Sequence, residues 1–368
     1  MTEPLLDVRD LSVDYLTEAG DVHVLSGVSF AVAEREFVGI VGESGCGKST
    51  LLFAVAQLLS PPGEIVSGEV VFRGGDMVGL RGGELRHMRW RDYSMVMQSA
   101  MNALNPMNSI GAQFADAMEA HGERSRERIR ARSREVLELV GIDAVHLGSY
   151  PHQLSGGMRQ RAMIAMALLF TPQLVIMDEP TSALDVVAQQ SLMTKIRELQ
   201  RRLGFAVLFV THDMSVVSRY SDRVIVMYAG QIAEAAATET IFERPLHPYT
   251  RGLMNAFPSV RGPRREMAGI PGAPPDLAHP PGGCRFHPRC PEVMDICPTR
   301  EPALYERDGA RVRCLLYEER AAVGARAEAP RSGAAQADAA QADAAQADVT
   351  VDAAVDAAQA DAAQEARP

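Results

Sequence analysis

The spacing of apolar and polar residues predicts strands and helices that alternate around a buried sheet. Residues 5–30 alternate in the manner of short β-strands. Helical periodicity covers residues 98–154 and Val186–Leu203. A helix is also expected from Lys48 to about Leu59. Apolar runs predict further strands at Glu36–Val41, Gly68–Arg73, Tyr93–Met97, Leu174–Met177, Phe205–Val210 and Arg223–Met227. This alternation indicates an α/β protein with a mostly parallel sheet.

Composition adds limits to this fold class. With 368 residues and 46% hydrophobic residues, the chain can bury one large core and a small appendage. The longest apolar runs fall well short of the roughly 20 residues of a membrane span. The start, MTEPLLDVRDLSV, lacks the pattern of an export signal. Half of the net charge of −10 lies after Arg331, so bulk charge does not favour nucleic-acid binding.

Three regions are predicted along the chain. Residues 1–260 form the main α/β domain, with residues 99–160 as an inserted helical subdomain. Residues 261–318 are rich in Pro and Gly, carry four cysteines, and are expected to form a small appended domain behind a stiff linker. Residues 319–368 repeat AAQAD and have almost nothing to bury, so disorder is expected, with a transient Ala-rich helix as the alternative.

A Gly-rich loop, GESGCGKST at Gly42–Thr50, lies between a predicted strand and a predicted helix. Its glycines permit a tight turn that points backbone N–H groups at phosphate oxygens. Lys48 would contact the β- and γ-phosphates, Ser49 would bind Mg²⁺, and Thr50 would bond the α-phosphate. The predicted nucleotide-binding residues are Gly42, Ser44, Gly45, Cys46, Gly47, Lys48, Ser49 and Thr50. The lysine at this position favours a functional phosphate site, because Lys48 and Lys195 are the only lysines among the 37 Lys and Arg residues of the chain.

Two carboxylates end the apolar run LVIMDEP at Leu174–Pro180. The carboxyl edge of a parallel sheet is where Asp178 should reach the Mg²⁺ of a bound nucleotide. Glu179 is the candidate general base that aligns water for attack on the γ-phosphorus. A solvated turn is the alternative, but a buried run precedes both residues.

The string LSGGMRQR at Leu154–Arg161, between these two motifs, resembles the signature of ATP-binding cassette (ABC) ATPases. The resemblance implies a P-loop NTPase fold with a RecA-like, mostly parallel sheet core and an antiparallel β subdomain. It also implies that the signature closes over ATP held by a second cassette subunit. The signature residues Ser155, Gly156 and Gly157 would cap the partner's γ-phosphate, and Asp185, in SALD, would lie in the loop that crosses the dimer interface.

Three single residues acquire roles only through the same resemblance. Gln98 matches the glutamine that senses Mg²⁺ and the attacking water, and His212 matches the histidine that contacts the γ-phosphate. Tyr15 matches the aromatic residue that stacks on adenine. Taken alone, His212 and Tyr15 would be interpreted as structural residues. The resemblance therefore predicts Glu179, His212 and Gln98 as catalytic, and Ser49, Gln98 and Asp178 as the Mg²⁺ site.

Segments outside the cassette motifs resemble the ATPases of oligopeptide/dipeptide importers. They are SAMNALNPMNSIGAQF after Gln98, RPLHPYTRGLMNAFPSV, and GIPGAPPDLAHPPGGCRFHPRCP. The resemblance implies an ATP-hydrolysing subunit at the cytoplasmic face of the cell membrane, peripheral to it. Its partners would be a second ABC ATPase subunit (identical or different), two transmembrane permease subunits and, indirectly, an extracytoplasmic solute-binding protein, with no nucleic acid.

Two alternatives to peptide import are weighed. Within transport, the solute could be an oligosaccharide or nickel. In a different class, soluble cassette ATPases serve DNA repair or translation. The spacing disfavours that class, because about a hundred residues without sustained heptads separate the loop from the signature, and the chain has one cassette.

Four cysteines lie late in the chain, at Cys284, Cys290, Cys297 and Cys314. They are separated by five, six and sixteen residues, so no CxxC pair is present and an ordinary zinc knuckle is disfavoured. Resemblance to cluster-bearing importer ATPases implies that all four bind a [4Fe–4S] cluster. Free thiols, or zinc with help from His287, are the alternatives.

Overall fold

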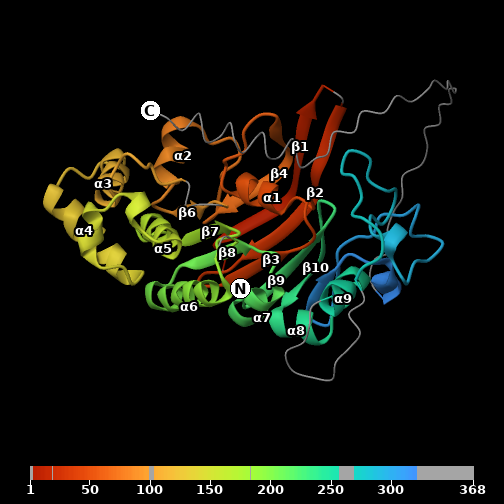
Figure 1. Ribbon diagram of the computed structural model, residues 1–368. Coiled ribbons are helices and arrows are strands. Elements are labelled where there is room, and N and C mark those ends of the chain that lie inside the picture. Colours follow the sequence, from red (N-terminus) through yellow and green to blue (C-terminus); the bar gives the residue numbers. More distant parts are fainter. Residues whose placement is uncertain (1–2, 19, 99–102, 183, 257–268, 321–368) are drawn as a thin grey trace.

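The core of the protein is an eight-stranded sheet in the order β11-β12-β10-β9-β3-β8-β7-β6, seen in the computed structural model (Figure 1). The structure describes residues 3–18, 20–98, 103–182, 184–256 and 269–320. The strands β6, β7, β8, β3 and β9 are parallel. They span Tyr93–Val96, Leu174–Asp178, Ala206–Val210, Phe37–Val41 and Arg223–Tyr228 respectively. Their carboxyl ends share one edge, which confirms the expected mostly parallel α/β core.

Both faces of this sheet are covered, and alternate residues of each strand enter different cores. In β8, Val207 and Phe209 join one hydrophobic cluster, whereas Ala206, Leu208 and Val210 join the other. A strand buried on both faces shows a continuous apolar run in sequence. That is why the sequence predicted these strands well.

A second, four-stranded antiparallel sheet in the order β2-β1-β4-β5 covers one face. Its strands span Leu6–Thr17 (β1), Gly20–Val32 (β2), Gly63–Phe72 (β4) and Gly75–Asp76 (β5). Strands cover most of residues 5–30 as expected, but the expectation that they are short was wrong. Two long strands pair instead, and register shifts in that pairing interrupt the alternation that marked shorter segments.

Helices complete the layers on both faces of the large sheet. Helix α1 (Lys48–Val55) packs Leu51 and Leu52 into the cluster that it shares with the antiparallel sheet. It ends earlier than expected, because Gln57 adopts a positive φ of 53°. Helix α6 has the predicted bounds, Val186–Leu203, and ends where Gly204 turns left-handed. The remaining helices of the opposite face are α7 (Met214–Tyr220), α8 (Thr238–Glu243) and α9 (Pro248–Asn255).

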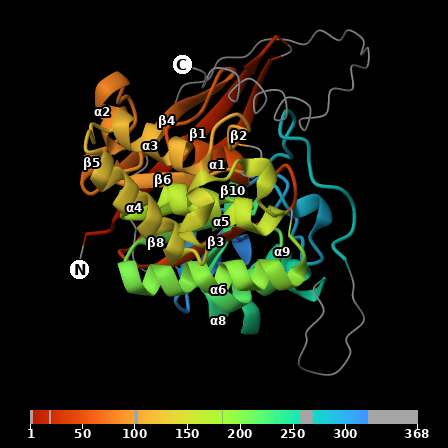
Figure 2. The ribbon, with the colours of Figure 1, turned by 60° about the vertical axis from the view of Figure 1, so that its left-hand side comes forward.

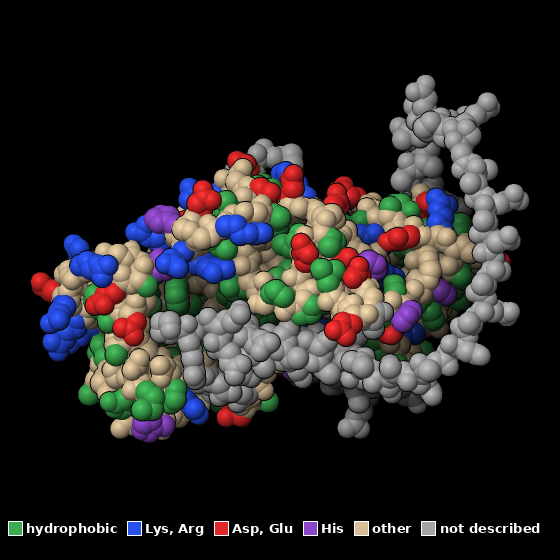
Figure 3. Space-filling model, turned by 90° about the horizontal axis from the view of Figure 1, so that it is seen from above, with side chains coloured by type: hydrophobic (Ala, Val, Ile, Leu, Met, Phe, Trp, Pro, Cys, Tyr) green, Lys and Arg blue, Asp and Glu red, His purple; other side chains and the backbone are tan. Residues whose placement is uncertain are grey.

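A helical region lies beyond the β6 edge of the sheet (Figure 1) and stands in front of the sheet in Figure 2. It contains α3 (Ile110–Ala120), α4 (Arg126–Leu139), two 3₁₀ turns at Ala144–Gly148 and Pro151–Gln153, and the start of α5 (Gly156–Ala167). Residues 99–102, at the start of the predicted subdomain, lie outside the described residues. The short helix α2 (Gly82–Met88) precedes β6. Lys and Arg side chains gather at this end of the molecule (Figure 3), but acids lie among them; Arg128, for instance, bonds Glu123 at 2.8 Å.

The C-terminal extension does not form a core of its own. Its strands β11 (Tyr305–Arg307) and β12 (Ala310–Val312) continue the large sheet, with β12 antiparallel to β10 (Gln231–Ala237). Phe286 packs its ring against Tyr228 and Tyr249, with centroids 5.1 and 5.4 Å apart. The extension therefore belongs to the main core, unlike the separate appended domain expected. Residues 261–268, at the start of the predicted extension, and residues 321–368 of the predicted tail lie outside the described residues.

None of the helices in the described ranges is long and apolar enough to cross a membrane.

Candidate nucleotide site

The Gly-rich loop connects β3 to α1 at the carboxyl edge of the sheet. Gly47 caps α1 in the left-handed region, with φ 94°. A Cβ on Gly47 would lie 2.8 Å from a Leu25 methyl and 3.0 Å from the carbonyl oxygen of Val24. A Cβ on Gly42 would lie 2.3 Å from the carbonyl oxygen of Met227. Both positions thus require glycine, because a side chain would displace backbone.

Lys48 folds back over this loop. Its Nζ donates to the carbonyl oxygens of Gly42 and Glu43 at 3.0 and 2.8 Å. Cys46 is buried beneath the loop, and burial raises the pKa of its thiol. Ser44 and Gly45 lie exposed at the tip of the loop. The loop therefore presents its backbone outward while its one ammonium group lies inside the turn.

Asp178, the last residue of β7, is 1% exposed. Ser49 donates its hydroxyl to Oδ1 at 3.2 Å, whereas the buried Oδ2 has no hydrogen-bond partner among the described residues. Burial, with a smaller contribution from the neighbouring Glu179 carboxylate, raises the pKa of Asp178 to about 6, although the Ser49 hydroxyl opposes this shift. An unpartnered carboxylate oxygen beside a serine hydroxyl fits Mg²⁺, which prefers hard oxygen ligands. The residues present thus suit the ion that accompanies ATP.

Glu179 lies between two partners that come from neighbouring strand ends. Gln98, after β6, donates its amide to Oε2 at 3.1 Å, and the Nδ1 of His212, after β8, lies 3.1 Å from Oε1. Since a carboxylate only accepts, Nδ1 carries the proton here. Glu179 adopts a positive φ of 42°, an unusual conformation for a residue with a side chain. The structure therefore gathers the three predicted catalytic residues around one carboxylate, beside a hollow of about 170 Å³.

Tyr15 lies beside the loop, with its hydroxyl 3.3 Å from the hydroxyl of Thr50. Its side chain packs into the main core, and 9% of the residue is exposed. This position is near the base of α1, where a nucleotide would extend from its phosphates. Stacking on adenine stays a prediction.

The signature residues lie at the start of a helix. Ser155 caps α5 by accepting a bond from the N–H of Met158, and Gly156 and Gly157 form the first turn. No hydrogen bond within the described ranges joins them to the Gly-rich loop. Asp185 caps α6 in the same manner through Ala188, at 2.8 Å, while its neighbour in SALD, Ala183, lies outside the described residues. Two exposed helix starts are therefore available to a partner.

Several polar contacts at the site had no counterpart in the sequence-based predictions. Gln160 of the signature helix donates to the carbonyl of Pro180, and Gln189 donates to Asp213 at 2.7 Å. In the Gly-rich loop, Glu43 pairs with Arg289 of the extension. No local pattern signals such contacts, because their partners lie far apart in the chain.

The four late cysteines are free thiols, three of them buried and Cys290 half-buried. Burial, with smaller contributions from the other three cysteines, raises the pKa of Cys314 to about 12. The N–H of Cys284 donates to the carbonyl of Cys297 at 2.8 Å, and His287 Nδ1 bonds the carbonyl of Cys284 at 3.0 Å. Within the described ranges, no three His, Cys, Asp or Glu side chains are grouped so that they could hold a single metal ion.

The sheet order and the phosphate loop, with a strand-end Asp-Glu pair beside it, define a P-loop ATPase of the cassette type. A family model for the ABC transporter matches residues 25–182, and one for the oligopeptide/dipeptide transporter C-terminal region matches residues 233–297.

Relatives extend this match along the chain. The dipeptide transport ATP-binding protein DppD of Caldanaerobacter subterraneus is 44% identical over 86% of this chain and 98% of its own. The oligopeptide transport ATP-binding protein OppD of Escherichia coli is 42% identical over 85% of this chain and 93% of its own. A solved cassette dimer, MJ0796 in a post-hydrolysis state with ADP and Pi, matches with a TM-score of 0.57 and 28% identity over 63% of this chain and 98% of that one.

The chain belongs to the ABC transporter ATP-binding proteins, in the group that carries the oligopeptide/dipeptide C-terminal region. This confirms the resemblance and the fold class inferred from the sequence. The chain is an ATP hydrolase of the ABC type.

Proposed function

We propose that this protein energises the uptake of dipeptides or oligopeptides. The observation that carries the proposal is the pairing of a cassette with the oligopeptide/dipeptide C-terminal region in one chain. Relatives named for dipeptide and oligopeptide transport match both parts at 39–44% identity. ATP binding and hydrolysis would drive the cycle, and the solute would pass through other subunits.

The contacts around Asp178 and Glu179 support a division of roles at the ATP site. Asp178 and Ser49, with Gln98, would hold Mg²⁺, which supplies charge neutralisation on the phosphates when bound. Lys48 would exchange its carbonyl partners for phosphate oxygens. Glu179 would accept a proton from the attacking water while Gln98 and His212 keep its carboxylate oriented. The geometry of this cluster suits water positioning, because both carboxylate oxygens have an anchoring donor.

A second cassette would complete the site. The exposed helix starts at Ser155 and Asp185 support this proposal, because backbone N–H groups at a helix start attract phosphate. Ser155, Gly156 and Gly157 would act on the partner's ATP and the partner's signature on ATP bound here. The partner can be a copy of this chain or a different ATPase subunit.

Two membrane permease subunits are the proposed receivers of the motion, which places this subunit peripherally at the cytoplasmic face of the membrane. Exposed apolar side chains on the helical region, Met107 and Val145, support a docking role there. A solute-binding protein on the other side would deliver peptide to the permease. The Arg-rich helix α4 is assigned no such role, because two of its arginines, Arg128 and Arg132, already pair with Glu123 and Glu135.

A [4Fe–4S] cluster on Cys284, Cys290, Cys297 and Cys314 is the proposal for the extension. Four cysteines without a disulfide support it, because three of them, Cys284, Cys290 and Cys297, lie near enough to Cys314 to raise the pKa of its thiol. Anaerobic purification should give a brown protein with absorbance near 400 nm and about four irons per chain. A colourless protein that contains zinc or no metal would refute the cluster.

Transport is tested in vesicles that contain this chain with its two permease subunits, its partner ATPase and the solute-binding protein. Dipeptide or oligopeptide should stimulate ATP hydrolysis and accumulate inside. Glu179→Gln should abolish uptake while the complex still binds ATP. Stimulation by an oligosaccharide or Ni²⁺ in place of peptide would overturn the assignment of the solute.

A further inference from the structure

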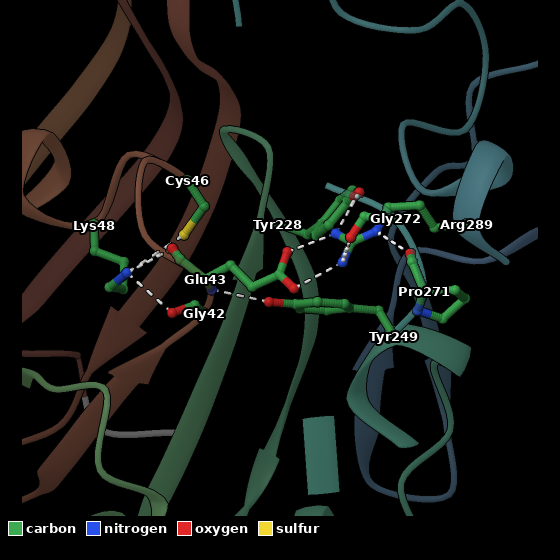
Figure 4. Close-up of polar contacts among 9 residues, drawn as sticks. All are labelled: Gly42, Glu43, Cys46, Lys48, Tyr228, Tyr249, Pro271, Gly272 and Arg289. Carbon is green, nitrogen blue, oxygen red and sulfur yellow. Dashed lines mark hydrogen bonds and ion pairs between the residues drawn. The ribbon is translucent and has the colours of Figure 1, made fainter. Parts of the chain in front are cut away.

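Arg289, in the C-terminal extension, forms a buried ion pair with Glu43 in the phosphate loop (Figure 4). Its Nη1 and Nη2 donate to the two carboxylate oxygens of Glu43 at 2.6 and 2.9 Å. The Arg289 side chain is 7% exposed and that of Glu43 is 23% exposed. The two residues are 246 positions apart. The pair therefore connects the ATP site to a segment that lies outside the matched cassette region.

The guanidinium is held on its other side as well. Its Nε donates to the carbonyl of Pro271 at 2.8 Å, and Nη2 donates to the carbonyl of Gly272 at 3.2 Å. Nη1 also lies 3.3 Å from the hydroxyl of Tyr228. A planar group with five donors can make all of these bonds at once, whereas a lysine cannot. Arg289 is thus fixed in the extension and presents a rigid fork to the loop.

Glu43 is held at three points, each from a different part of the chain. Its carboxylate binds Arg289, its N–H donates to the hydroxyl of Tyr249 at 3.0 Å, and its carbonyl accepts from Lys48 at 2.8 Å. The exposed tip of the loop, where phosphate would bind, begins at the next residue. Fixing Glu43 therefore fixes the direction in which the phosphate-binding backbone leaves β3.

We propose that Arg289 is a positioning residue for ATP binding. By holding Glu43 it keeps the phosphate loop preorganised, so the extension raises ATP affinity without touching the nucleotide. The inference rests on ATP binding at this loop and is independent of the transported solute. Its prediction is that loss of either partner weakens ATP binding, and that loss of both adds little more.

The test is an equilibrium titration of the full chain with a fluorescent ATP analogue and Mg²⁺. Arg289→Gln and Glu43→Gln should each raise Kd about tenfold, which corresponds to about 1.4 kcal/mol. The double variant should also be about tenfold weaker, because one interaction is lost in all three. Arg289→Lys, which keeps the charge but not the fork, should lie between wild type and Arg289→Gln.

Arg313→Gln is the matched control. Arg313 is another arginine of the extension, half-buried where Arg289 is buried, and it donates to the carbonyls of Ile232 and Pro302 instead of to Glu43. Its Kd should stay within about twofold of wild type. If circular dichroism shows that Arg289→Gln does not fold, the Kd of Glu43→Gln alone tests the proposal. The proposal is overturned if the folded single variants bind as wild type does, if Arg313→Gln weakens binding equally, or if the double variant is about a hundredfold weaker.

Discussion

Replacing Asp178 with Asn should raise the stability of the nucleotide-free protein, relative to wild type, as the pH increases from 4 to 8. Asp178 is buried, and its pKa rises from 3.8 to about 6 on folding. The folded state therefore binds this proton more tightly than the unfolded state does. Below pH 3.8 the carboxyl is neutral in both states and costs nothing. As pH rises through the window from about 4 to 6, the folded state loses stability, and the cost is complete above it.

The size of the effect follows from that shift. A difference of about two pKa units corresponds to about 3 kcal/mol at 1.36 kcal/mol per unit. Asparagine cannot ionise, so Asp178→Asn avoids this cost. Its amide can still accept from Ser49, but the NH₂ group replaces an oxygen that has no partner in the described structure, which costs about 1–3 kcal/mol at every pH. The second effect is the same at every pH, whereas the first depends on the ionisation of Asp178. The quantity to measure is therefore how the stability difference between variant and wild type changes from one pH to another.

Urea unfolding of both proteins at pH 4 and pH 8, with chelator present to remove Mg²⁺, measures this quantity. The variant should gain about 2 kcal/mol on wild type between the two pH values, because part of the cost is already present at pH 4; other titrating groups cancel in the comparison. Glu198→Gln removes one negative charge from an exposed pair with Lys195 and serves as the control. A stability difference between Asp178→Asn and wild type that is the same at both pH values would refute the reasoning.

Three further outcomes are expected at the ATP site. Glu179→Gln should reduce steady-state ATP turnover in the assembled complex about 10²–10⁴-fold, through loss of the base, with ATP binding retained; full turnover would show that Glu179 is not the base. Gly47→Ala should lower the free energy of unfolding by more than about 1–2 kcal/mol in urea titrations, because its φ of 94° and the contact with Leu25 both oppose a side chain; unchanged stability would contradict this. Tyr15→Ala should raise Kd for ATP about tenfold or more while Tyr15→Phe leaves it near wild type, as stacking requires; equal effects would instead implicate the hydroxyl that lies near Thr50.

The parts of the fold that were predictable carry their signal locally. The buried strands of the large sheet and α6 were predictable because apolar runs and helical periodicity extend over whole elements. The phosphate loop, Asp178 and Glu179 were predictable because each lies immediately after such a strand. The hairpin β11-β12 was not, since its three-residue strands are too short for a pattern and are stabilised by pairing with β10 far upstream.

Contacts between distant segments limit what the sequence reveals about the site. Nothing around Glu43 indicates that its partner lies in a Pro-rich extension, because no periodic pattern relates positions so far apart. The four cysteines of that extension predicted a metal site, whereas no pattern predicted a role for Arg289, which is next to Cys290. The extension was expected to be a separate domain for the same reason: its composition differs from the cassette, but its side chains complete the same core.

The hairpin of the extension also determines what the sheet offers to other polypeptides. Without it, the seven-residue strand β10 would end the sheet with a row of unpaired N–H and C=O groups. Such a row is a template for strand addition and aggregation. With the hairpin in place, this border is β11, which is three residues long and includes Glu306 and Arg307. The extension thereby disfavours β-pairing between molecules at this edge of the sheet. The protein is expected to associate with a second cassette through its nucleotide site, and the short β11 edge makes polymerisation through the sheet unfavourable.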